Sequence, residues 1–569
     1  MMSEKIQGNV AIPGIAIGKI MKVGQSLDGY MAAYTPGSAE EELSKLEEAI
    51  DTISAAIDES VEAMRAAGQD EQAEIMEAHS FLLMDPMLTD GMNDKTREMA
   101  HAPKAVLEAA EECAEMLAGM DDEYMRERSA DVKDIGRRIA RYLLGVKEPE
   151  IGEEPVVLCG FEVEPSAIAN IPDEKIAGVI MGQGSTTCHA VIIAKSRAIT
   201  TVVGLENRVE DIPEGAKVLL DGNEGLVLVD PSAEELASYE ARIKAQQEEQ
   251  KRLEALKDLP AETTDGVKVQ LAANIGLPED AEAAAKYGNQ GVGLFRSEFL
   301  FMGRENIPDE ELQFESYKRA IVACQGETCV IRTMDIGGDK PLAYLNIPHE
   351  DNPFLGYRAI RISLERPDLF MPQLKGILRA GVHGKAAIMC PMVINVDEIK
   401  AVREAVNKAM SELEAEGKEY SKDVQVGIMV ETPAAAVMTP VLAKYVDFFS
   451  IGTNDLVQYT LAVDRVNPQI SKLYDHFNPA VLQLIYRTIK AGVDNGKWVG
   501  MCGEMASDPY AAVILMAMGI TELSMSAPSI PKVKEKIRSV SMEEAKAHLE
   551  KVMTMETGEE IRDYLHNNI

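Results

Sequence analysis

The sequence predicts an α/β multidomain protein that ends in a (β/α)8 TIM barrel, preceded by a smaller α/β domain with an inserted helical bundle. A chain of 569 residues is too long for one ordinary hydrophobic core. From residue 260 to the end, apolar runs of strand length alternate with helical stretches, which is typical of a barrel. Residues 30–146, by contrast, show only the spacing of amphipathic helices.

The N-terminal part predicts a first pair of strands followed by helices. Short apolar runs on either side of Pro13 predict strands within residues 1–29. Between Ser38 and Ala67, apolar residues recur every three or four positions and predict one long helix. Further helices are expected over residues 71–84, 105–120 and 122–144. Residues 30–146 are therefore expected to form a bundle.

The character of the chain changes at residue 147. Short apolar strands separated by Gly and Pro fill residues 147–231, and with residues 1–29 they are expected to form one compact α/β domain. Residues 232–259 are charged and helix-forming, which indicates a linker helix. Residues 260–569 then supply the barrel.

Charged or reactive residues follow the apolar runs of the barrel. Parallel barrel strands are buried on both faces and read as near-continuous apolar runs, and their C-terminal ends surround the active site. Seven strands are clear, and a weaker eighth is expected near Tyr357–Ile362 or at Ala380. The residues expected to converge on one pocket are Arg296, Arg332, Glu431, Asp455 and Cys502.

These residue types indicate a site for a phosphorylated anion and a divalent metal. Arginines stabilise the charge on a phosphoryl group during transfer. Mg²⁺ prefers one or two carboxylates together with phosphate oxygens and water, so Glu431 and Asp455 are the expected ligands. A single strand-end arginine is often a salt-bridge residue, but several beside two carboxylates favour a binding site. The cations expected to contact the anion are Arg296, Arg332, Lys340, Arg358 and Arg465.

Two residues are candidates for covalent and proton chemistry. His189 follows a Gly/Ser/Thr turn and precedes a helical apolar pattern, so it is expected at a helix start, where an imidazole could accept a phosphoryl group. Cys502 ends the last clear strand, and a thiol with a reference pKa of about 8.5 stays mostly protonated at neutral pH. It could protonate a carbanion. The alternatives are a structural histidine and a small buried apolar side chain.

The composition excludes several classes of protein. A formal net charge of −37 argues against nucleic acid and anionic membranes as partners. It indicates either a solvated surface or a docking face for a basic protein. Seven cysteines without a CxxC pair form neither a disulfide framework nor a zinc site. With no apolar signal core and no run long enough to span a bilayer, a cytoplasmic protein is expected.

Several segments together resemble one family. In the barrel they are RTMDIGGDK at 332–340, NPFLGYR at 352–358, GIMVETP at 427–433, GTNDL at 452–456 and LSMS at 523–526. In the N-terminal half they are PGIAIG at 13–18 and RSADVKDIG at 128–136. The sequence resembles Enzyme I, the phosphoenolpyruvate–protein phosphotransferase of the bacterial sugar phosphotransferase system.

The resemblance implies a function for each part. Phosphoenolpyruvate would bind in the barrel with Mg²⁺ and contact Asn454 as well as the cations named above. Its phosphoryl group would pass to His189, and Cys502 would protonate the product to pyruvate. His189 would then transfer the group to a histidine-containing phosphocarrier protein docked on residues 30–146, in the first step of sugar transport. The barrel would form a homodimer.

The segment around His189 departs from the family pattern, which reads Gly-Gly-Arg-Thr-Ser-His-Thr. Ser185, Thr186, Cys188 and Ala190 replace four of these positions, and Ile168 replaces a threonine in an earlier loop. Two alternatives therefore remain. One is a phosphoenolpyruvate-sensing regulatory paralogue with impaired transfer, and the other is a dikinase-like enzyme that draws a nucleotide-binding domain from a separate chain.

Overall fold

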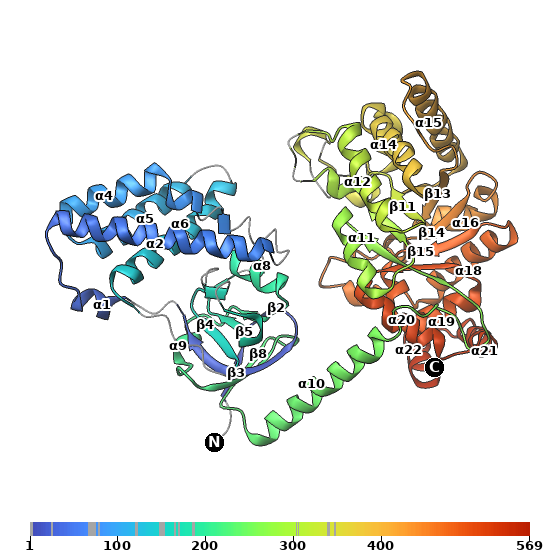
Figure 1. Ribbon diagram of the computed structural model, residues 1–569. Coiled ribbons are helices and arrows are strands. Elements are labelled where there is room, and N and C mark those ends of the chain that lie inside the picture. The colour runs from blue at the N-terminus through green and yellow to red at the C-terminus, as the bar shows by residue number, and fades with distance from the viewer. Residues whose placement is uncertain are drawn as a thin grey trace. The chain divides into compact units, whose positions relative to one another are not determined.

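The computed structural model divides the chain into two compact units, Met1–Gln246 and Gln247–Ile569 (Figure 1). The structure describes residues 4–23, 27–66, 76–77, 80–119, 123–146, 154–163, 167–168, 171–184, 188–302, 304, 306–337, 342–345, 347 and 349–569. Across these ranges, no helix combines the length and the apolar character needed to cross a bilayer.

Within the described part of the first unit, eight strands form a sheet in the order β1-β8-β7-β3-β4-β5-β6-β2. Strands β3 to β6 pair in parallel, and the other pairs are antiparallel. Both faces are covered. Helix α8 (His189–Ser196) packs on one face through Val191, and α9 (Arg208–Asp211) packs on the other through Val209. The strands are β1 Glu4–Gln7, β2 Asn9–Ile12, β3 Ile15–Lys22, β4 Val156–Gly160, β5 Ile176–Met181, β6 Thr200–Val203, β7 Lys217–Asp221 and β8 Leu226–Val229.

A helical bundle is inserted between β3 and β4, as the sequence predicts. The apolar residues of α2 that recur every three or four positions, among them Leu46 and Ile57, are buried. Pro86 starts α4, where a missing N–H costs nothing. Gly136 allows helices α5 and α6 to approach closely, because any other residue here would place its Cβ 2.3 Å from that of Ala110. The helices are α1 Asp28–Ala33, α2 Ala39–Ala66, α4 Pro86–Met99, α5 Ala102–Ala118 and α6 Glu123–Leu143.

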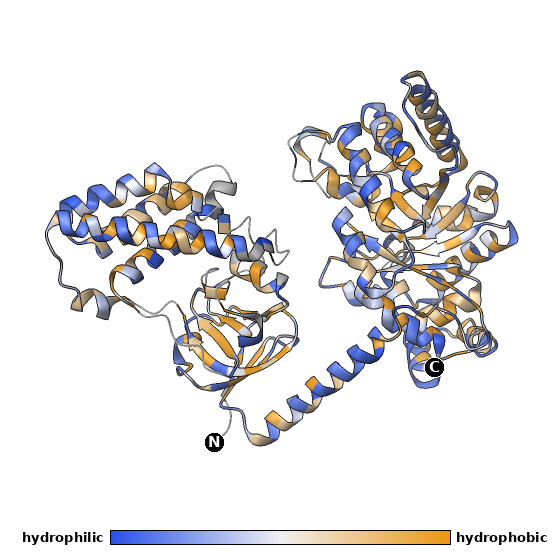
Figure 2. Ribbon diagram, in the orientation of Figure 1, coloured by the Kyte–Doolittle hydropathy of each residue, from blue (hydrophilic) through white to orange (hydrophobic). Residues whose placement is uncertain are grey.

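The linker helix α10 (Ala233–Glu254) contains the boundary between the two units. All of its residues are described and none is buried, and hydrophilic residues alternate with fewer apolar ones along it (Figure 2). In the first unit, its Arg242 pairs with the buried Asp221 at 3.1 Å. In the second unit, its Arg252 pairs with Glu535 at 2.9 Å. Side-chain pairs therefore hold each half of the helix to its own unit.

The described part of the second unit contains eight parallel strands that close into a barrel, which confirms the predicted (β/α)8 fold. Most strand residues are buried, because helices cover the outside and side chains fill the inside. The barrel strands are β9 Gln270–Ile275, β10 Val292–Arg296, β11 Cys329–Arg332, β12 Ala386–Cys390, β13 Gln425–Val430, β14 Phe448–Ile451, β15 Trp498–Met501 and β16 Glu522–Met525.

The position expected for the weaker eighth strand was wrong. Residues 360–362 begin a helix and Ala380 ends one, so neither stretch is a strand. The eighth strand is β9, whose alanine-rich run has only one of the bulky β-branched residues that mark strands in sequence, Ile275. The helices around the barrel are α11 Pro278–Ala284, α12 Glu310–Ala323, α13 Ile360–Glu365, α14 Pro367–Ala380, α15 Val396–Ala415, α16 Pro433–Leu442, α17 Thr453–Leu461, α18 Pro479–Asp494, α19 Pro509–Met518, α20 Ile530–Arg538, α21 Met542–Val552 and α22 Gly558–Asn568.

Large side chains pack the barrel interior near the start of the strands. Phe448 begins β14 and Trp498 begins β15, and their rings stack with centroids 4.2 Å apart. The neighbouring strand has Gly427 here, because a Cβ would lie 2.5 Å from the Phe448 ring. Leu294 and Met429 belong to the same interior cluster. Apolar side chains therefore fill the interior near the start of the strands, and the polar residues lie at the carboxyl ends.

Candidate active site

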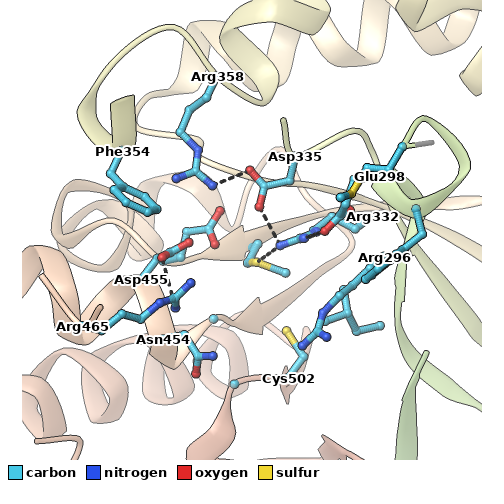
Figure 3. A pocket seen from close by; sticks show the side chains of 17 residues that line it. Arg296, Glu298, Arg332, Asp335, Phe354, Arg358, Asn454, Asp455, Arg465 and Cys502 are labelled. Atoms are coloured by element: carbon cyan, nitrogen blue, oxygen red, sulfur yellow. Dashed lines mark hydrogen bonds and ion pairs between the residues drawn. The ribbon is translucent and has the colours of Figure 1, made fainter. Parts of the chain in front are cut away.

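The carboxyl ends of the barrel strands surround a pocket of about 330 Å³ (Figure 3). Arg296 and Arg332 are the last residues of β10 and β11. Glu431 and Cys502 directly follow β13 and β15, and Asp455 lies in the first turn of α17, just after β14. Parallel strands present their last residues at one rim. The pocket is therefore lined by all five of these residues.

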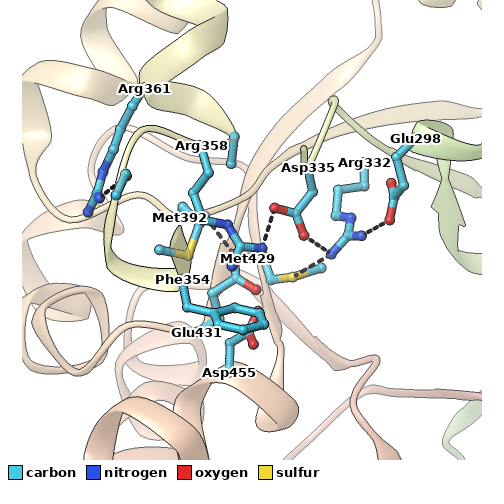
Figure 4. A network of polar contacts seen from close by, with 12 residues as sticks. Glu298, Arg332, Asp335, Phe354, Arg358, Arg361, Met392, Met429, Glu431 and Asp455 are labelled. Carbon is cyan, nitrogen blue, oxygen red and sulfur yellow. Dashed lines mark hydrogen bonds and ion pairs between the residues drawn. The ribbon is translucent and has the colours of Figure 1, made fainter. Parts of the chain in front are cut away.

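Two buried arginines of the pocket share one carboxylate. Asp335 Oδ2 lies 2.9 Å from Arg332 Nη1, and Asp335 Oδ1 accepts a hydrogen bond of 2.7 Å from Arg358 Nη2 (Figure 4). Arg332 also pairs with Glu298. Burial disfavours both guanidinium charges, but the neighbouring carboxylates outweigh it and raise the pKa of Arg332 and of Arg358. Both side chains are therefore permanent, positioned cations.

Glu431 and Asp455 form a pair of carboxylates. Glu431 is 1% exposed, and its Oε1 accepts the Met392 N–H at 2.6 Å. Burial, and then the charges of Asp455 and Asp335, raise the pKa of Glu431 to about 8. Asp455 Oδ1 lies 3.5 Å from Arg465 Nη1 but accepts no hydrogen bond from the described residues.

This donor set fits a hard divalent cation. Two close carboxylates destabilise each other's charge, and a cation between them would remove that cost. The described residues contain no cluster of three or more His, Cys, Asp or Glu side chains that could hold a metal. Substrate and water oxygens would therefore have to complete the coordination, which is the arrangement that Mg²⁺ favours.

Cys502 presents a protonated thiol to the pocket. The residue is 4% exposed, and its Sγ accepts a hydrogen bond of 3.4 Å from Ser450 Oγ. Burial raises the pKa of the Cys502 thiol to about 11, although Ser450 and Arg332 act in the opposite direction. The thiol is therefore a proton donor at neutral pH rather than a nucleophilic thiolate.

Asn454 and Phe354 complete the walls. Asn454 Nδ2 donates to Glu504 Oε1 at 3.2 Å, and Asn454 Oδ1 accepts the Glu504 N–H at 2.9 Å, which fixes the orientation of the amide. The Phe354 ring lies 5.7 Å from the Arg358 guanidinium, and its carbonyl accepts the Tyr459 hydroxyl at 2.5 Å. The pocket thus combines several charged groups with one aromatic wall.

The remaining predicted residues divide between the two units. Arg358, Asn454 and Arg465 line the same pocket. His189 is the first residue of α8 in the first unit, as expected for a helix start, and Cys188 at the N-cap makes no side-chain capping bond. The next residue, Ala190, is buried in the same apolar cluster as Ile168. Lys340, Ser185 and Thr186 lie outside the described residues.

Sequence reasoning gave no role to several residues that line the pocket, among them Glu298, Asp335 and Phe354. Glu298 lies two residues after the end of β10, and Asp335 lies three residues after the end of β11. The strand-end rule that identified the arginines could have found both carboxylates. Phe354 lies in a loop with no comparable signal.

Comparisons with known proteins cover both units. Family models match the N-terminal part of PEP-utilising enzymes at residues 7–128, their mobile domain at 152–225 and their PEP-binding domain at 250–542. A phosphoenolpyruvate-protein phosphotransferase of Priestia megaterium is 42% identical over 567 residues, 99% of each chain. One of Staphylococcus epidermidis is 40% identical over 568 residues, again 99% of each. The solution structure of the Enzyme I protein nEIt is 31% identical and covers 42% of this chain and 99% of that one, with a TM-score of 0.36.

Proposed function

Because the chain belongs to the phosphoenolpyruvate–protein phosphotransferase family and acts as an Enzyme I, we propose that its barrel pocket binds phosphoenolpyruvate and that His189 accepts the phosphoryl group. The phosphohistidine then passes the group to a histidine-containing phosphocarrier protein, and pyruvate is released. Full-length similarity to phosphotransferases does not favour the phosphoenolpyruvate-sensing alternative.

The charges of the pocket support binding of this substrate. Arg332 and Arg358 are positioned cations that suit phosphate and carboxylate groups. Four arginines and four carboxylates line the pocket, so its side chains alone carry little net charge. A divalent cation on Glu431 and Asp455 would supply the excess positive charge that a phosphorylated acid requires, and when bound it would stabilise the charge on the phosphoryl oxygens. The other proposed substrate contacts are Arg296, Lys340, Asn454 and Arg465.

We assign the role of proton donor in pyruvate formation to Cys502. Transfer breaks the phosphorus–oxygen bond of the enol ester, forms a phosphorus–nitrogen bond at His189 and leaves an enolate. The Cys502 thiol, protonated and open to the pocket, gives its proton to the terminal carbon of the enolate, which becomes the methyl group of pyruvate. The thiolate then recovers a proton from water.

We assign the docking site of the carrier protein to the helical bundle of residues 30–146. Phe81, Met84 and Met87 lie close together in the chain and are exposed by 73%, 68% and 42%. Large exposed apolar side chains mark interaction surfaces, and methionine adapts its shape to a partner. Since the chain carries a net charge of −37, a carrier with a basic contact face would be attracted to it.

The division of the chain supports separate tasks. We assign residues 1–29 and 147–231 to the phosphohistidine domain, 232–259 to the linker and 260–569 to substrate binding and a homodimer contact. His189 belongs to one unit and the pocket to the other, so transfer requires the two to meet. Seven free cysteines suit a reducing cytoplasm.

The observation that carries this proposal is the pocket that joins positioned arginines, paired carboxylates and a protonated thiol. Incubation with phosphoenolpyruvate labelled in its phosphoryl group and Mg²⁺ should give an acid-labile label on the protein. The label should disappear in His189→Ala and persist in His566→Ala, an exposed histidine of α22. Adding carrier should discharge it. An unchanged label in His189→Ala would assign the acceptor elsewhere.

A further inference from the structure

Behind the pocket, a buried chain of hydrogen bonds joins α12 and α14 to the ends of β10 and β11. Its side chains are those of Ser297, Gln313, Tyr317 and Gln373, each no more than 1% exposed. Gln373 lies on α14 and is not among the described residues that line the pocket. Burying four polar side chains is costly unless each is hydrogen-bonded, so their arrangement here calls for a physical reason.

The amide of Gln373 makes three hydrogen bonds. Its Nε2 donates to Ser297 Oγ at 2.9 Å and to Tyr317 Oη at 3.0 Å, while its Oε1 accepts the Met334 N–H at 2.9 Å. A backbone N–H can only donate, so the amide oxygen must face Met334 and the nitrogen must face the two hydroxyls. The orientation of the Gln373 amide is therefore determined by its partners.

The two hydroxyls pass the hydrogen bonds onward. Ser297 accepts from Gln373 and donates to the Arg332 carbonyl at 2.6 Å. Tyr317 donates to Gln313 Oε1 at 2.9 Å. Burial raises the pKa of the Tyr317 phenol, so it remains a neutral donor at all working pH values. Each group has one donor direction, and the whole chain of bonds can therefore form in only one way.

The network fixes the segment that carries Arg332. The Arg332 carbonyl is bound through Ser297, and the N–H of Met334, two residues later, is bound through Gln373. Glu298, the neighbour of Ser297, pairs with the Arg332 guanidinium. Residues that follow β10 therefore hold both the backbone and the guanidinium of Arg332.

We propose that Gln373 is a positioning residue for phosphoryl transfer, which holds Arg332 at the pocket by tying the end of β11 to that of β10. The inference rests on the proposed role of Arg332 in binding the phosphoryl group. Displacing a charged group by a fraction of an ångström lowers the rate, and a shift of 1 Å can cost about 10²-fold.

The test compares Gln373→Met with Gln373→Glu. Gln373→Met keeps the length but removes all three hydrogen bonds, and kcat/KM for phosphoenolpyruvate should fall about 10- to 100-fold, with most of the loss in kcat. Glutamate can still accept from Met334, but it donates only when protonated. In this buried site its pKa should be raised, because Tyr317 and Ser297 are neutral and Glu298 and Arg332 are already paired to each other. Gln373→Glu should therefore recover activity as the pH falls, which neither wild type nor Gln373→Met should do.

Controls separate positioning from loss of stability. The control is Thr488→Val in α18, a position distant in sequence from Gln373. It removes one buried hydrogen bond, to the Leu484 carbonyl, and should lower stability without lowering kcat/KM. If Gln373→Met does not fold, Ser297→Ala interrupts the same hydrogen-bond network with a smaller change in side-chain volume. The losses in Ser297→Ala and Gln373→Glu should be less than additive when combined.

Two outcomes would overturn the inference, namely wild-type kcat/KM in the folded Gln373 variants, or a Gln373→Glu defect that is not relieved at low pH. Arg332→Ala distinguishes this from failure of the proposed function. If Arg332→Ala is inactive while the Gln373 variants are normal, only the positioning role fails. If Arg332→Ala is fully active, the proposed role of Arg332 fails as well.

Discussion

At the scale of single residues, burial decides the protonation states on which the proposed chemistry depends. Burial raises the pKa of the Cys502 thiol and keeps it protonated beyond neutral pH, whereas the two carboxylates that contact Arg332 keep its guanidinium charged despite burial. Residue type already favours both states. The surroundings strengthen them through the balance between desolvation and the neighbouring charges.

Cys502→Ser should separate proton transfer from binding. Serine keeps nearly the same volume but is a much weaker acid, and losing a general acid typically costs 10²–10⁴-fold in rate. Pyruvate formation, measured in single turnovers by rapid quench, should slow by about that factor. The dissociation constant of phosphoenolpyruvate, measured by calorimetry with Mg²⁺, should change by less than about threefold. Equal pyruvate release by both proteins would leave Cys502 as a packing residue.

Asp455→Asn and Glu431→Gln should raise the Mg²⁺ concentration needed for activity. Each keeps the shape of the side chain but replaces a carboxyl that can bind a hard cation as a carboxylate with a neutral amide. Initial rates across a Mg²⁺ titration, with EDTA at the zero point, measure the shift. Asp368→Asn, whose carboxylate pairs with Arg366 at 2.7 Å on the surface, is the control. A wild-type Mg²⁺ requirement in both pocket variants would contradict the proposed metal site.

At the scale of elements, β16 carries a buried carboxyl that the proposed reaction does not use. Glu522 is 4% exposed, and burial raises its pKa to about 7. Strand β15, which pairs with β16, and strand β10, which lies beyond β9, have glycines here, because a Cβ at Gly500 or Gly293 would lie 2.9 Å or 2.6 Å from Glu522 Oε1. The carboxyl thus occupies space that the glycines of β10 and β15 leave open.

The Glu522 carboxyl should make barrel stability depend on pH. Between about 4.5 and about 7 the folded state holds a proton that the unfolded chain has released, so stability should fall as the pH rises through this window. Glu522→Gln should remove that part of the slope. Thermal unfolding at several pH values, followed by the fluorescence of Trp498, would measure this slope. Trp498 is a suitable reporter because its ring, like Glu522, lies next to Gly500, where a Cβ would be 3.4 Å from the ring. An identical pH slope in the variant would show that Glu522 does not titrate.

At the scale of the whole molecule, each unit has its own hydrophobic cores, so we expect each to unfold in its own transition. In the bundle, the Glu42 carboxylate is fully buried and accepts the N–H groups of Gly37 and Ala102, both at 3.0 Å. It also accepts from Tyr34 and Lys45. One side chain therefore joins the start of α2 to the start of α5.

Glu42→Gln should destabilise the first unit alone. Burial raises the pKa of Glu42, but the hydrogen bonds from Lys45 and the backbone outweigh it and lower the pKa to about 2. The contribution is present above about 4.5 and is lost as the pH falls towards 2. The variant should lose about 2 kcal/mol at neutral pH. Calorimetry should show one transition lowered and the barrel transition unchanged. A shift of both transitions would mean that the units unfold together.

The sequence by itself determined the periodic features of this protein. Helical spacing located α2, and apolar runs that end in charged residues located most of the barrel strands and the arginines at their ends. These patterns are local consequences of the 3.6-residue helix and of strands buried on both faces.

Only the tertiary structure decided which distant groups meet. Gln373 reaches Ser297, Glu42 reaches Ala102, and an alanine-rich strand closes the barrel, yet none of these has a signal within its own segment. The physical reason is that a hydrogen bond between remote residues depends on how the strands close around the core. Local periodicity fixes the elements, whereas their packing fixes the partners and the protonation states of the buried groups.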